Sequence, residues 1–384
     1  AQWNRTIIGE FDDYNYYSRN GVKLDENAIK DYSYSEYGRE GFVADGNSRI
    51  ILRVKTNKPG HVSFTFKDNE DIGAVIEVLK DRTKLSSGSS IETEEVGGSM
   101  KYQASAVIVA PENFPRKKFP SDTFKINVKF TDEDGLTEEK DLTFIIEAAP
   151  VVLIPGFNAG SSSYAEFGIG RKNTLWSKLK NDGFTIDKWD YSSGSIHDLL
   201  SRERNGLFIT LSLLFDKYSE RKIVCTKADL VAYGMGGLLA RYFCLPEKIQ
   251  DDGNYYSFRS YKRGMVRRMI TIATPHEGSP IANYALYGTT PLAPDTIMDL
   301  LNPDYLFAKV VLALVKSKVQ EHFIFAQSAL KDLALNSDLI NSLNSRSSVP
   351  IHVICGRVRD NIDSVQIFDM PKYFSMIFSI KMLS

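Results

Sequence analysis

Cysteine is scarce in this chain of 384 residues. There are only three, Cys225, Cys244 and Cys355, and they lie far apart. An odd number of widely spaced cysteines argues against a disulfide framework and against a Cys-x-x-Cys metal knuckle. Each lies in or beside an apolar run, so we expect buried free thiols. Cysteine usage leaves the cellular compartment open.

An excess of either charge is also missing. The chain has 47 Lys and Arg against 48 Asp and Glu, a net charge of -1. Capture of nucleic acid needs a basic stripe, and short clusters such as Arg116-Lys117-Lys118 and Arg267-Arg268 are better explained as solvated loops and strand ends. No nucleic-acid partner is therefore expected. The hydrophobic share of 43% is ordinary for a globular protein, and at about 150 residues per domain the length predicts two or three domains.

No apolar run approaches the about 18 residues of a membrane-spanning helix, and no signal-peptide pattern begins at Ala1. The longest apolar segments, Tyr305–Val315 and Tyr373–Leu383, each contain a lysine. Buried or lid helices explain them better than a membrane span.

The first 147 residues have a pattern that differs from the rest. Residues 1–40 are rich in Tyr, Asn, Asp and Gly without a sustained period, and they are expected to form an irregular lead-in with room for one short strand. From Gly41 to Glu147, short apolar or alternating runs are separated by turn signals such as Asp45-Gly46-Asn47, which is typical of a β-sandwich. Strands are predicted at Arg49–Lys55, His61–Phe66, Ala104–Val109, Lys125–Phe130 and Leu142–Glu147.

Two local motifs refine this part. The stretch Val43-Ala-Asp-Gly-Asn-Ser-Arg-Ile-Ile-Leu52 resembles the opening of invasin-type bacterial Ig-like domains. Asp132-Glu133-Asp134-Gly135 lacks the remaining ligands of an EF-hand loop, so we predict a hairpin turn there instead of a calcium site.

After Ala148-Ala149-Pro150 the pattern changes to alternating strands and helices. Such alternation predicts an α/β domain with a parallel sheet and right-handed crossovers. The predicted division is 1–40, 41–147 and 148–384. Strands are predicted at Val151–Ile154, Phe184–Trp189, Ala228–Ala232, Met269–Ala273 and Ile351–Cys355, and helices at Thr174–Lys180, Leu207–Tyr218 and Met235–Phe243.

Three segments of this second part carry a family resemblance. The first is Val151-Val-Leu-Ile-Pro-Gly-Phe157, a strand that ends in a glycine turn. The second is Ala228-Asp-Leu-Val-Ala-Tyr-Gly-Met-Gly-Gly-Leu-Leu-Ala-Arg-Tyr242, and the third is Ile272-Ala-Thr-Pro-His-Glu-Gly-Ser-Pro280. In this order they resemble α/β-hydrolase lipases, whose nucleophile elbow reads Val-Asp-Leu-Val-X-His-Ser-Met-Gly-Gly-Leu-X-X-Arg. A weaker match begins at Ser328, and the resemblance covers roughly residues 150–365.

The resemblance implies a lipase or carboxylesterase that cleaves carboxylic esters of lipids through an acyl-enzyme, with no metal and no organic cofactor. The nucleophile position is then Gly234, and the backbone N–H groups of Phe157 and Met235 form the oxyanion hole. His276 follows the next strand, where this family uses a histidine to shape the pocket wall. His276-Glu277 does not extend to an HExxH zinc site.

Two departures from the family pattern stand out. Gly234 has no oxygen or sulfur for a base to deprotonate. The acid is expected at Asp360 or Asp363, although both also fit a solvated loop, and no histidine follows His352, which lies inside a predicted strand. Either the base lies beyond Ser384 or the protein lacks one. We therefore predict an inactive chain, which fits both an engineered knock-out and a natural pseudoenzyme.

A second hypothesis is a non-catalytic secreted or surface binding protein that keeps a hydrolase pocket and an Ig-like module. In both cases we expect an extracellular or cell-envelope location. The segment from about 281 to 345, with apolar patches at Leu306-Phe307 and Val310-Val311-Leu312, is predicted to form a helical cap that contacts a lipid surface. Packing of this segment into the core is the alternative prediction.

Overall fold

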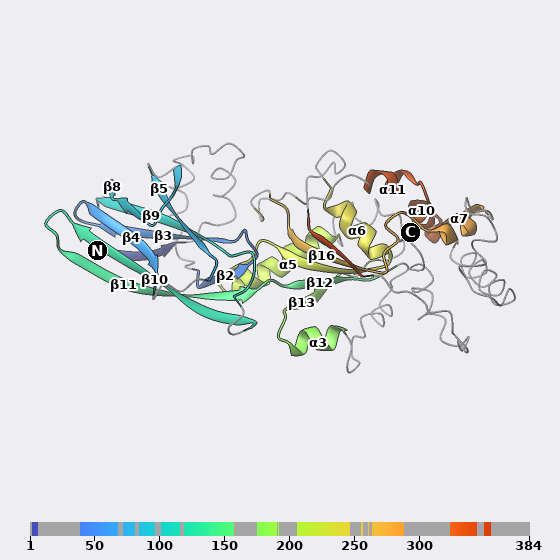
Figure 1. Ribbon diagram of the computed structural model, residues 1–384, viewed down its shortest axis with the longest axis horizontal. Helices are drawn as coiled ribbons and strands as arrows, with labels where there is room; N and C mark the ends of the chain where they lie inside the picture. Colours follow the sequence, from blue (N-terminus) through green and yellow to red (C-terminus); the bar gives the residue numbers. More distant parts are fainter. Residues whose placement is uncertain are drawn as a thin grey trace.

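The structure is a computed structural model. It describes residues 2–6, 39–67, 72–80, 84–96, 101–115, 119–156, 175–189, 191, 206–245, 255, 260, 263–287, 323–343 and 349–354. The described part is rich in β-structure and elongated, with two packed sheets at one end and a parallel sheet with helices at the other (Figure 1).

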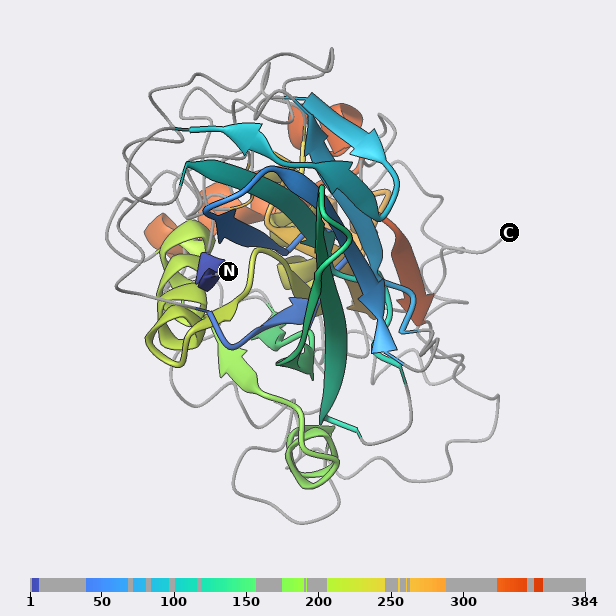
Figure 2. The ribbon, with the colours of Figure 1, turned by 90° about the vertical axis from the view of Figure 1, so that its left-hand side faces the viewer.

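The first sheet of the sandwich is antiparallel. Its strand order is β1 (Gln2–Thr6), β3 (Arg49–Thr56), β9 (Tyr102–Val109), β5 (Val75–Lys80) and β6 (Lys84–Ser87), and β8 (Glu94–Glu95) also pairs with β9. The second sheet has the order β14 (Ile223–Val224), β2 (Gly41–Ala44), β11 (Thr137–Ala148), β10 (Ser121–Asp132), β4 (Gly60–Phe66) and β7 (Ser90–Glu92). Figure 2 looks along the molecule at these two layers.

Period-two alternation explains how the two sheets share a core. Along β10, Phe124, Ile126 and Val128 are buried, whereas Lys125 and Lys129 are exposed. Because successive side chains of a strand point to opposite faces, the apolar set meets the inner residues of the other sheet. All five strands that the sequence predicts here are present. The structure adds β2 and β5 to β8, and three of the latter four have only two to four residues.

The hairpin between β10 and β11 confirms the predicted turn. The Asp132 carboxylate accepts a hydrogen bond from the Leu136 backbone N–H at 2.8 Å. The Lys58 ammonium lies 3.3 Å from Asp132 and 2.7 Å from Asp134. A lysine therefore occupies the position in which a cation would have to lie.

The parallel sheet has five strands in the order β13 (Ile186–Lys188), β12 (Val151–Ile154), β15 (Ala228–Tyr233), β16 (Val266–Ile272) and β17 (Ile351–Ile354). All neighbouring pairs are parallel. Its described helices are α3 (Leu175–Asn181), α5 (Leu207–Glu220), α6 (Met235–Phe243), α7 (Pro280–Tyr287), α10 (Phe323–Leu333) and α11 (Asp338–Leu343). No described helix has the length and apolarity needed to cross a membrane.

Both faces of this sheet are covered, as the continuous apolar run of β12 predicts. Val152 and Ile154 belong to the large core that also contains α5 and α6. Val151 and Leu153 face the opposite side, where Trp176 and Leu179 of α3 pack. The buried free thiols expected at Cys225 and Cys244 are confirmed. Cys355 lies outside the described residues.

The predicted cap is described only at its two ends. On α10 and α11, the side chains of Leu330, Leu333, Ile340 and Leu343 are buried in the same core as α6. These ends therefore follow the core-packing alternative. The apolar patches at 306–307 and 310–312 lie outside the described residues, so the cap itself stays a prediction.

Strand β14 connects the two parts of the chain. It follows α5, yet it pairs in parallel with β2, matching Ile223 to Gly41 and Val224 to Phe42. The side chain of Val224 is buried in the sandwich core. The division at residue 148 stays a prediction, but the sandwich sheet includes a strand from beyond it.

A buried carboxylate strengthens this junction. Asp45 follows β2, and its Oδ1 accepts hydrogen bonds from the backbone N–H groups of Asn47 at 2.8 Å and Ser48 at 2.6 Å. Its Oδ2 accepts from the backbone N–H groups of Thr226 and Lys227, each at 3.0 Å. The hydroxyls of Ser48 and Thr226 add bonds at 2.7 and 2.9 Å. We call Asp45 and these partners the Asp45 clasp.

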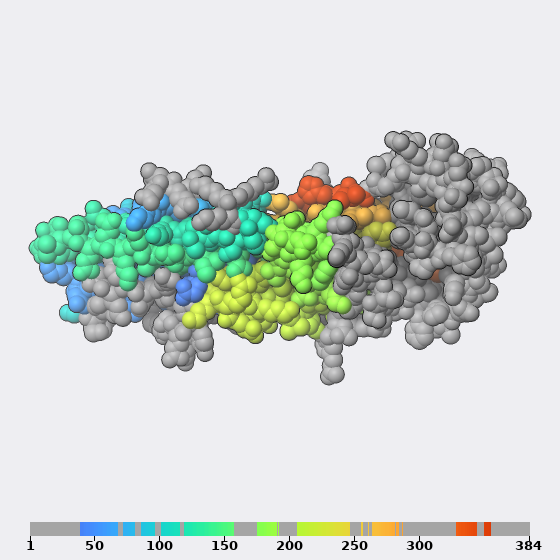
Figure 3. Space-filling model, turned by 90° about the horizontal axis from the view of Figure 1, so that it is seen from below, coloured from blue at the N-terminus to red at the C-terminus, as the bar shows by residue number. Residues whose placement is uncertain are grey.

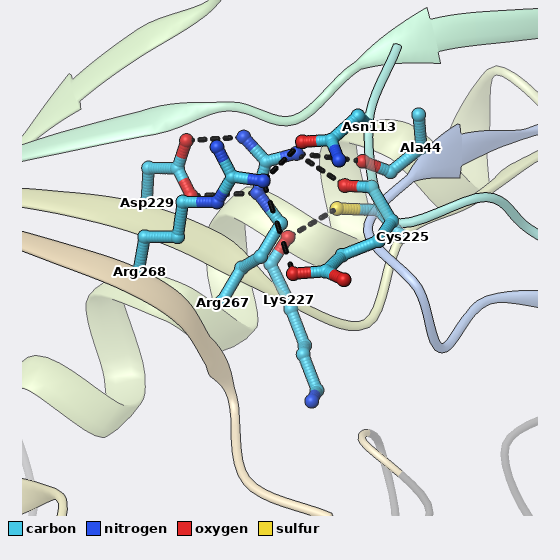
Figure 4. Close-up of polar contacts among 8 residues, drawn as sticks. Ala44, Asn113, Cys225, Lys227, Asp229, Arg267 and Arg268 are labelled. Atoms are coloured by element: carbon cyan, nitrogen blue, oxygen red, sulfur yellow. Dashed lines mark hydrogen bonds and ion pairs between the residues drawn. The ribbon is translucent and has the colours of Figure 1, made fainter. Parts of the chain in front are cut away.

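An arginine makes a second connection. Figure 4 shows Arg267 of β16 beside Asp229 of β15, and Arg267 Nε donates to the Asp229 carboxylate at 2.7 Å. Its Nη1 donates to the backbone carbonyls of Ala44 at 3.0 Å and Glu112 at 2.8 Å. The amino ends of the parallel strands are therefore bonded directly to the sandwich.

Candidate functional site

The candidate site lies at the carboxyl ends of the parallel strands, around the turn from β15 to α6. β15 ends at Tyr233, one residue later than predicted, and α6 begins at Met235, as the sequence predicts. Gly234 between them has φ +52° and ψ -125°. Its N–H donates to the Ile272 carbonyl of β16 at 2.9 Å. The chain therefore makes a sharp strand-to-helix turn at Gly234.

The space around Gly234 is sufficient for a larger residue. A Cβ atom added there would meet only the Gly156 Cα, at 3.7 Å, which is an ordinary contact. The positive φ is the cost, because residues with a Cβ rarely adopt this region and the strain amounts to about 1–3 kcal/mol. Glycine therefore relieves backbone strain at this turn, whereas a side chain would fit sterically.

The two following glycines are required by close packing. A Cβ on Gly236 would lie 2.3 Å from the Pro155 carbonyl oxygen, and one on Gly237 would lie 2.1 Å from Thr274 Oγ1. The first turn of α6 therefore approaches the ends of β12 and β16 more closely than any side chain permits. Small residues at positions 236 and 237 therefore maintain the contact between α6 and these two strands.

The two neighbours of Gly234 face away from each other. Tyr233 packs on the sheet face that α3 covers, and Met235 is buried in the core on the other face. Neither supplies a substitute nucleophile. The Met235 N–H is the first of α6, so it has no acceptor within the helix. It lies at the positive end of the helix dipole, which favours negative charge.

The end of β12 is held by a tyrosine. The Tyr191 hydroxyl lies 2.6 Å from the carbonyl oxygens of both Pro155 and Gly156. These carbonyls therefore face Tyr191, which fixes the backbone that leads to position 157. The sequence argument did not single out Tyr191, because nothing in its local pattern marks a contact this far along the chain.

His276 is held in place by its hydrogen bonds and does not act as a free base. Its Nδ1 lies 3.0 Å from an Arg241 guanidinium nitrogen, and its Nε2 lies 3.0 Å from Thr271 Oγ1. Because arginine can only donate, Nδ1 accepts and the ring proton belongs on Nε2. Burial, together with the adjacent Arg241 charge, lowers the pKa of His276 to about 4. The ring is therefore neutral near pH 7 and braces the loop after β16.

Arg241 links this loop to the end of the predicted cap. Its guanidinium donates to the His276 ring and also to the Leu343 carbonyl at the end of α11. Arg241 is the arginine of the quoted elbow motif, but the sequence assigned it no role. The motif alone does not identify the partner of this arginine, so this contact required the structure.

The remaining predicted site residues lie outside the described part of the chain. These are Phe157, expected in the oxyanion hole, and Asp360 and Asp363, the alternative acids. Within the described ranges, no cluster of three or more His, Cys, Asp or Glu side chains could hold a metal ion. The described geometry thus contains a sharp strand-to-helix turn, a helix N-terminus and a neutral histidine, and position 234 within it carries no side chain.

No protein-family model matches this sequence, and no match to a curated protein was found. Among solved structures, an esterase from the hyperthermophilic archaeon Pyrobaculum calidifontis is similar over 62% of this chain and 65% of its own, with 12% identity and a TM-score of 0.30. The YadV chaperone is similar to the N-terminal part, with 10% identity and a TM-score of 0.21.

A PapD-like domain of human CEP192 is likewise similar over 29% of this chain and 80% of its own, with 10% identity and a TM-score of 0.17. This chain spans about half the length of the YadV chaperone, 49%. These similarities are weak, so the interpretation of the site rests on the geometry described above.

Proposed function

We propose that this chain descends from carboxylic ester hydrolases of the lipase or carboxylesterase type, that its parallel sheet is an α/β-hydrolase sheet, and that Gly234 occupies the nucleophile position. The main support is the turn at Gly234. It combines a positive φ, which would be strained for any residue with a side chain, with two following glycines that close packing requires. A turn that only reversed the chain would not need this combination.

The arrangement explains what a serine at position 234 would do. Its Oγ would lie beside the Met235 N–H and attack an ester carbonyl, while its proton passes to a histidine base, the group for which this sequence offers no candidate. The base would then give that proton to the leaving alkoxide, so that the alcohol departs as the acyl-enzyme forms. Water would then release the acid. The developing oxyanion would accept hydrogen bonds from the Met235 N–H and, in our proposal, from the N–H of Phe157.

Without a serine oxygen at position 234, the chain can still bind an ester but cannot form the acyl-enzyme. Loss of the nucleophile lowers turnover about a million-fold in a comparable protease. The helix N-terminus and the Met235 N–H do not depend on the side chain at 234. We therefore expect the chain to bind carboxylic esters or fatty acids weakly and to hydrolyse esters at the background rate.

The alternative function is a non-catalytic binding protein of the cell envelope or the extracellular space. Gly234 itself favours it, because glycine at this φ stabilises the turn and removes the reaction at the same position. The two proposals share one fold. They differ in whether the other residues of the site would support ester hydrolysis once a nucleophile is restored at position 234.

The decisive experiment restores the oxygen. Gly234→Ser is introduced into the full-length gene product, with Gly234→Ala as the matched control, since alanine adds the same Cβ and the same backbone strain without a hydroxyl. Hydrolysis of a chromogenic short-chain ester is measured, together with labelling by a serine-directed phosphonate. We expect both signals from the serine variant alone.

A folded serine variant that shows neither turnover nor labelling contradicts the hydrolase proposal, and the binding protein then takes its place. Circular dichroism establishes that each variant is folded before activity is compared.

A further inference from the structure

Two successive carbonyls at the end of β12 face one hydroxyl. The Tyr191 hydroxyl lies 2.6 Å from the carbonyl oxygens of both Pro155 and Gly156. Successive carbonyls of a strand point to opposite sides, so the chain has left the strand conformation here. A hydroxyl has one proton, and the two carbonyls therefore share a single donor. One tyrosine thus determines the orientation of two peptide units.

Tyr191 is itself held in place. Its side chain is 5% exposed, and its ring centroid lies 5.0 Å from that of Trp189. The Trp189 N–H donates to the Leu153 carbonyl of β12 at 3.0 Å. Tyr191 therefore comes from a segment that is bonded to β12 just before the two carbonyls. Its hydroxyl has little freedom to follow them if they turn.

The same two peptide units border position 234. A Cβ at this position would lie 3.7 Å from the Gly156 Cα, and a Cβ on Gly236 would lie 2.3 Å from the Pro155 carbonyl oxygen. The Pro155 carbonyl is thus held between the Tyr191 hydroxyl and the first turn of α6. An ester that reacts with a side chain at position 234 would develop its negative charge close to these peptide units.

The direction of the Gly156 carbonyl decides what that charge would meet. A peptide unit is planar and trans, so its N–H points opposite to its carbonyl. With the carbonyl bonded to Tyr191, the N–H of the same unit points away from Tyr191. Glycine has the greatest backbone freedom of all residues, so this unit can rotate once the hydroxyl is removed. A rotated unit would turn a carbonyl lone pair toward the developing negative charge.

We propose that Tyr191 is a positioning residue for ester hydrolysis at this site. Its hydroxyl holds the Pro155 and Gly156 carbonyls away from the oxyanion, so that an N–H donor faces it instead. This role rests on the proposed hydrolase function and adds a residue to it; Tyr191 does not touch the substrate. Because the oxyanion exists in the transition state and not in the bound ester, loss of the hydroxyl lowers kcat and leaves KM nearly unchanged.

The kinetic test removes this hydroxyl alone. Tyr191→Phe is combined with Gly234→Ser in the full-length gene product, and hydrolysis of a chromogenic short-chain ester is measured over a range of concentrations. Phenylalanine keeps the ring against Trp189. Relative to Gly234→Ser alone, we expect kcat to fall about 30–100-fold and KM to change by less than about twofold.

Tyr218→Phe in the same serine chain is the matched control. Tyr218 is 1% exposed and belongs to the same core as Tyr191. It lies near the end of α5, the yellow-green helix at the surface in Figure 3, where the Arg221 guanidinium lies 5.2 Å from its ring. The control therefore removes a buried hydroxyl that does not bond the end of β12. We expect it to change kcat by less than about twofold.

Amide hydrogen exchange tests the positioning without catalysis. It is measured on the chain with Gly234 unchanged, in fragments that cover Val151 to Gly156. Tyr191→Phe should speed exchange there, because the backbone loses its donor, and Tyr218→Phe should not. Circular dichroism establishes that both variants are folded.

Unchanged exchange at the end of β12 would overturn the proposal, because the hydroxyl would not hold this backbone. A kcat equal to that of Gly234→Ser, a change confined to KM, or an equal loss in Tyr218→Phe would also overturn it. An inactive Gly234→Ser chain is a different result, since it removes the hydrolase proposal and the role of Tyr191 together. Faster exchange with undiminished kcat removes the role of Tyr191 alone.

Discussion

Replacing Asp45 by asparagine measures how strongly the sandwich is bonded to the parallel sheet. Asparagine has the same shape but only one acceptor oxygen. The remaining oxygen can still accept the hydrogen bonds from the N–H groups of Asn47 and Ser48. The new NH₂ group then replaces Oδ2, which in the unchanged chain accepts hydrogen bonds from the Thr226 and Lys227 N–H groups at 3.0 Å. Four donors then point at one another in a region where Asp45 is 2% exposed and Thr226 is fully buried.

The expected loss follows from these contacts. A buried donor left without an acceptor costs about 1–3 kcal/mol, and hydrogen bonds to a charged acceptor contribute about 1.5–3 kcal/mol. Because the donors share one carboxylate, the costs do not add fully, and we expect Asp45→Asn to lower the free energy of unfolding by about 3–5 kcal/mol. This is a large share of the about 5–15 kcal/mol that stabilises a typical protein.

Urea unfolding followed by two probes checks this value. Two of the three tryptophans, Trp176 and Trp189, lie in the parallel-sheet part, and Trp3 lies on β1 of the sandwich. With Trp3 replaced by phenylalanine in every chain compared, tryptophan fluorescence reports on the parallel-sheet part, whereas far-UV circular dichroism reports on both parts. We expect coincident transitions in the unchanged chain and an earlier, split transition in the variant. The matched control is Asp134→Asn, since Asp134 is 70% exposed in its pair with Lys58 and should change stability by less than about 0.5 kcal/mol. If Asp45→Asn matched this control, the clasp would not join the two parts.

Two further predictions concern the candidate site. Gly234→Ala should lower the free energy of unfolding by about 1–3 kcal/mol through backbone strain alone. Gly236→Ala should lower it by more than about 3 kcal/mol, because its Cβ would lie 2.3 Å from a backbone oxygen. Thermal unfolding of both variants gives the order of the two losses, and a reversed order would contradict the packing argument. The pKa of His276 is lowered from 6.5 to about 4 in the folded chain. Between these two pH values the unfolded chain binds a proton at His276 that the folded chain does not bind. The free energy of unfolding should therefore fall as the pH is lowered from 6.5 toward 4. His276→Gln should flatten this fall and the exposed His61→Gln should not; equal slopes in both would refute the assignment.

Local patterns in the sequence predicted the elements that depend on local physics. Val151–Ile154 and Met235–Phe243 appear with the predicted bounds. An apolar run buried on both faces and a helix that follows a glycine turn are determined within a few residues, so one sequence is sufficient to find them. The requirement for small residues at Gly236 follows from the same local motif.

Contacts between distant segments could not be predicted in this way. Asp45-Gly46-Asn47 was correctly interpreted as a turn signal, yet the main partners of the Asp45 carboxylate include Thr226, 181 residues away in the sequence. A buried carboxylate and a solvated turn carboxylate have the same local pattern. Similarly, β14 has only two residues, too few for a period to be detected.

The pairing of β14 with β2 also determines the order in which the protein can mature. The chain emerges from the ribosome N-terminus first, so β2 is made long before its parallel neighbour at Ile223–Val224. Until then, one edge of β2 has no strand beside it and the Asp45 carboxylate lacks its donors at Thr226 and Lys227. Closing a loop of this length costs entropy before any contact compensates it, which slows folding. The sandwich, although first in sequence, is therefore completed late, together with the central strand of the parallel sheet.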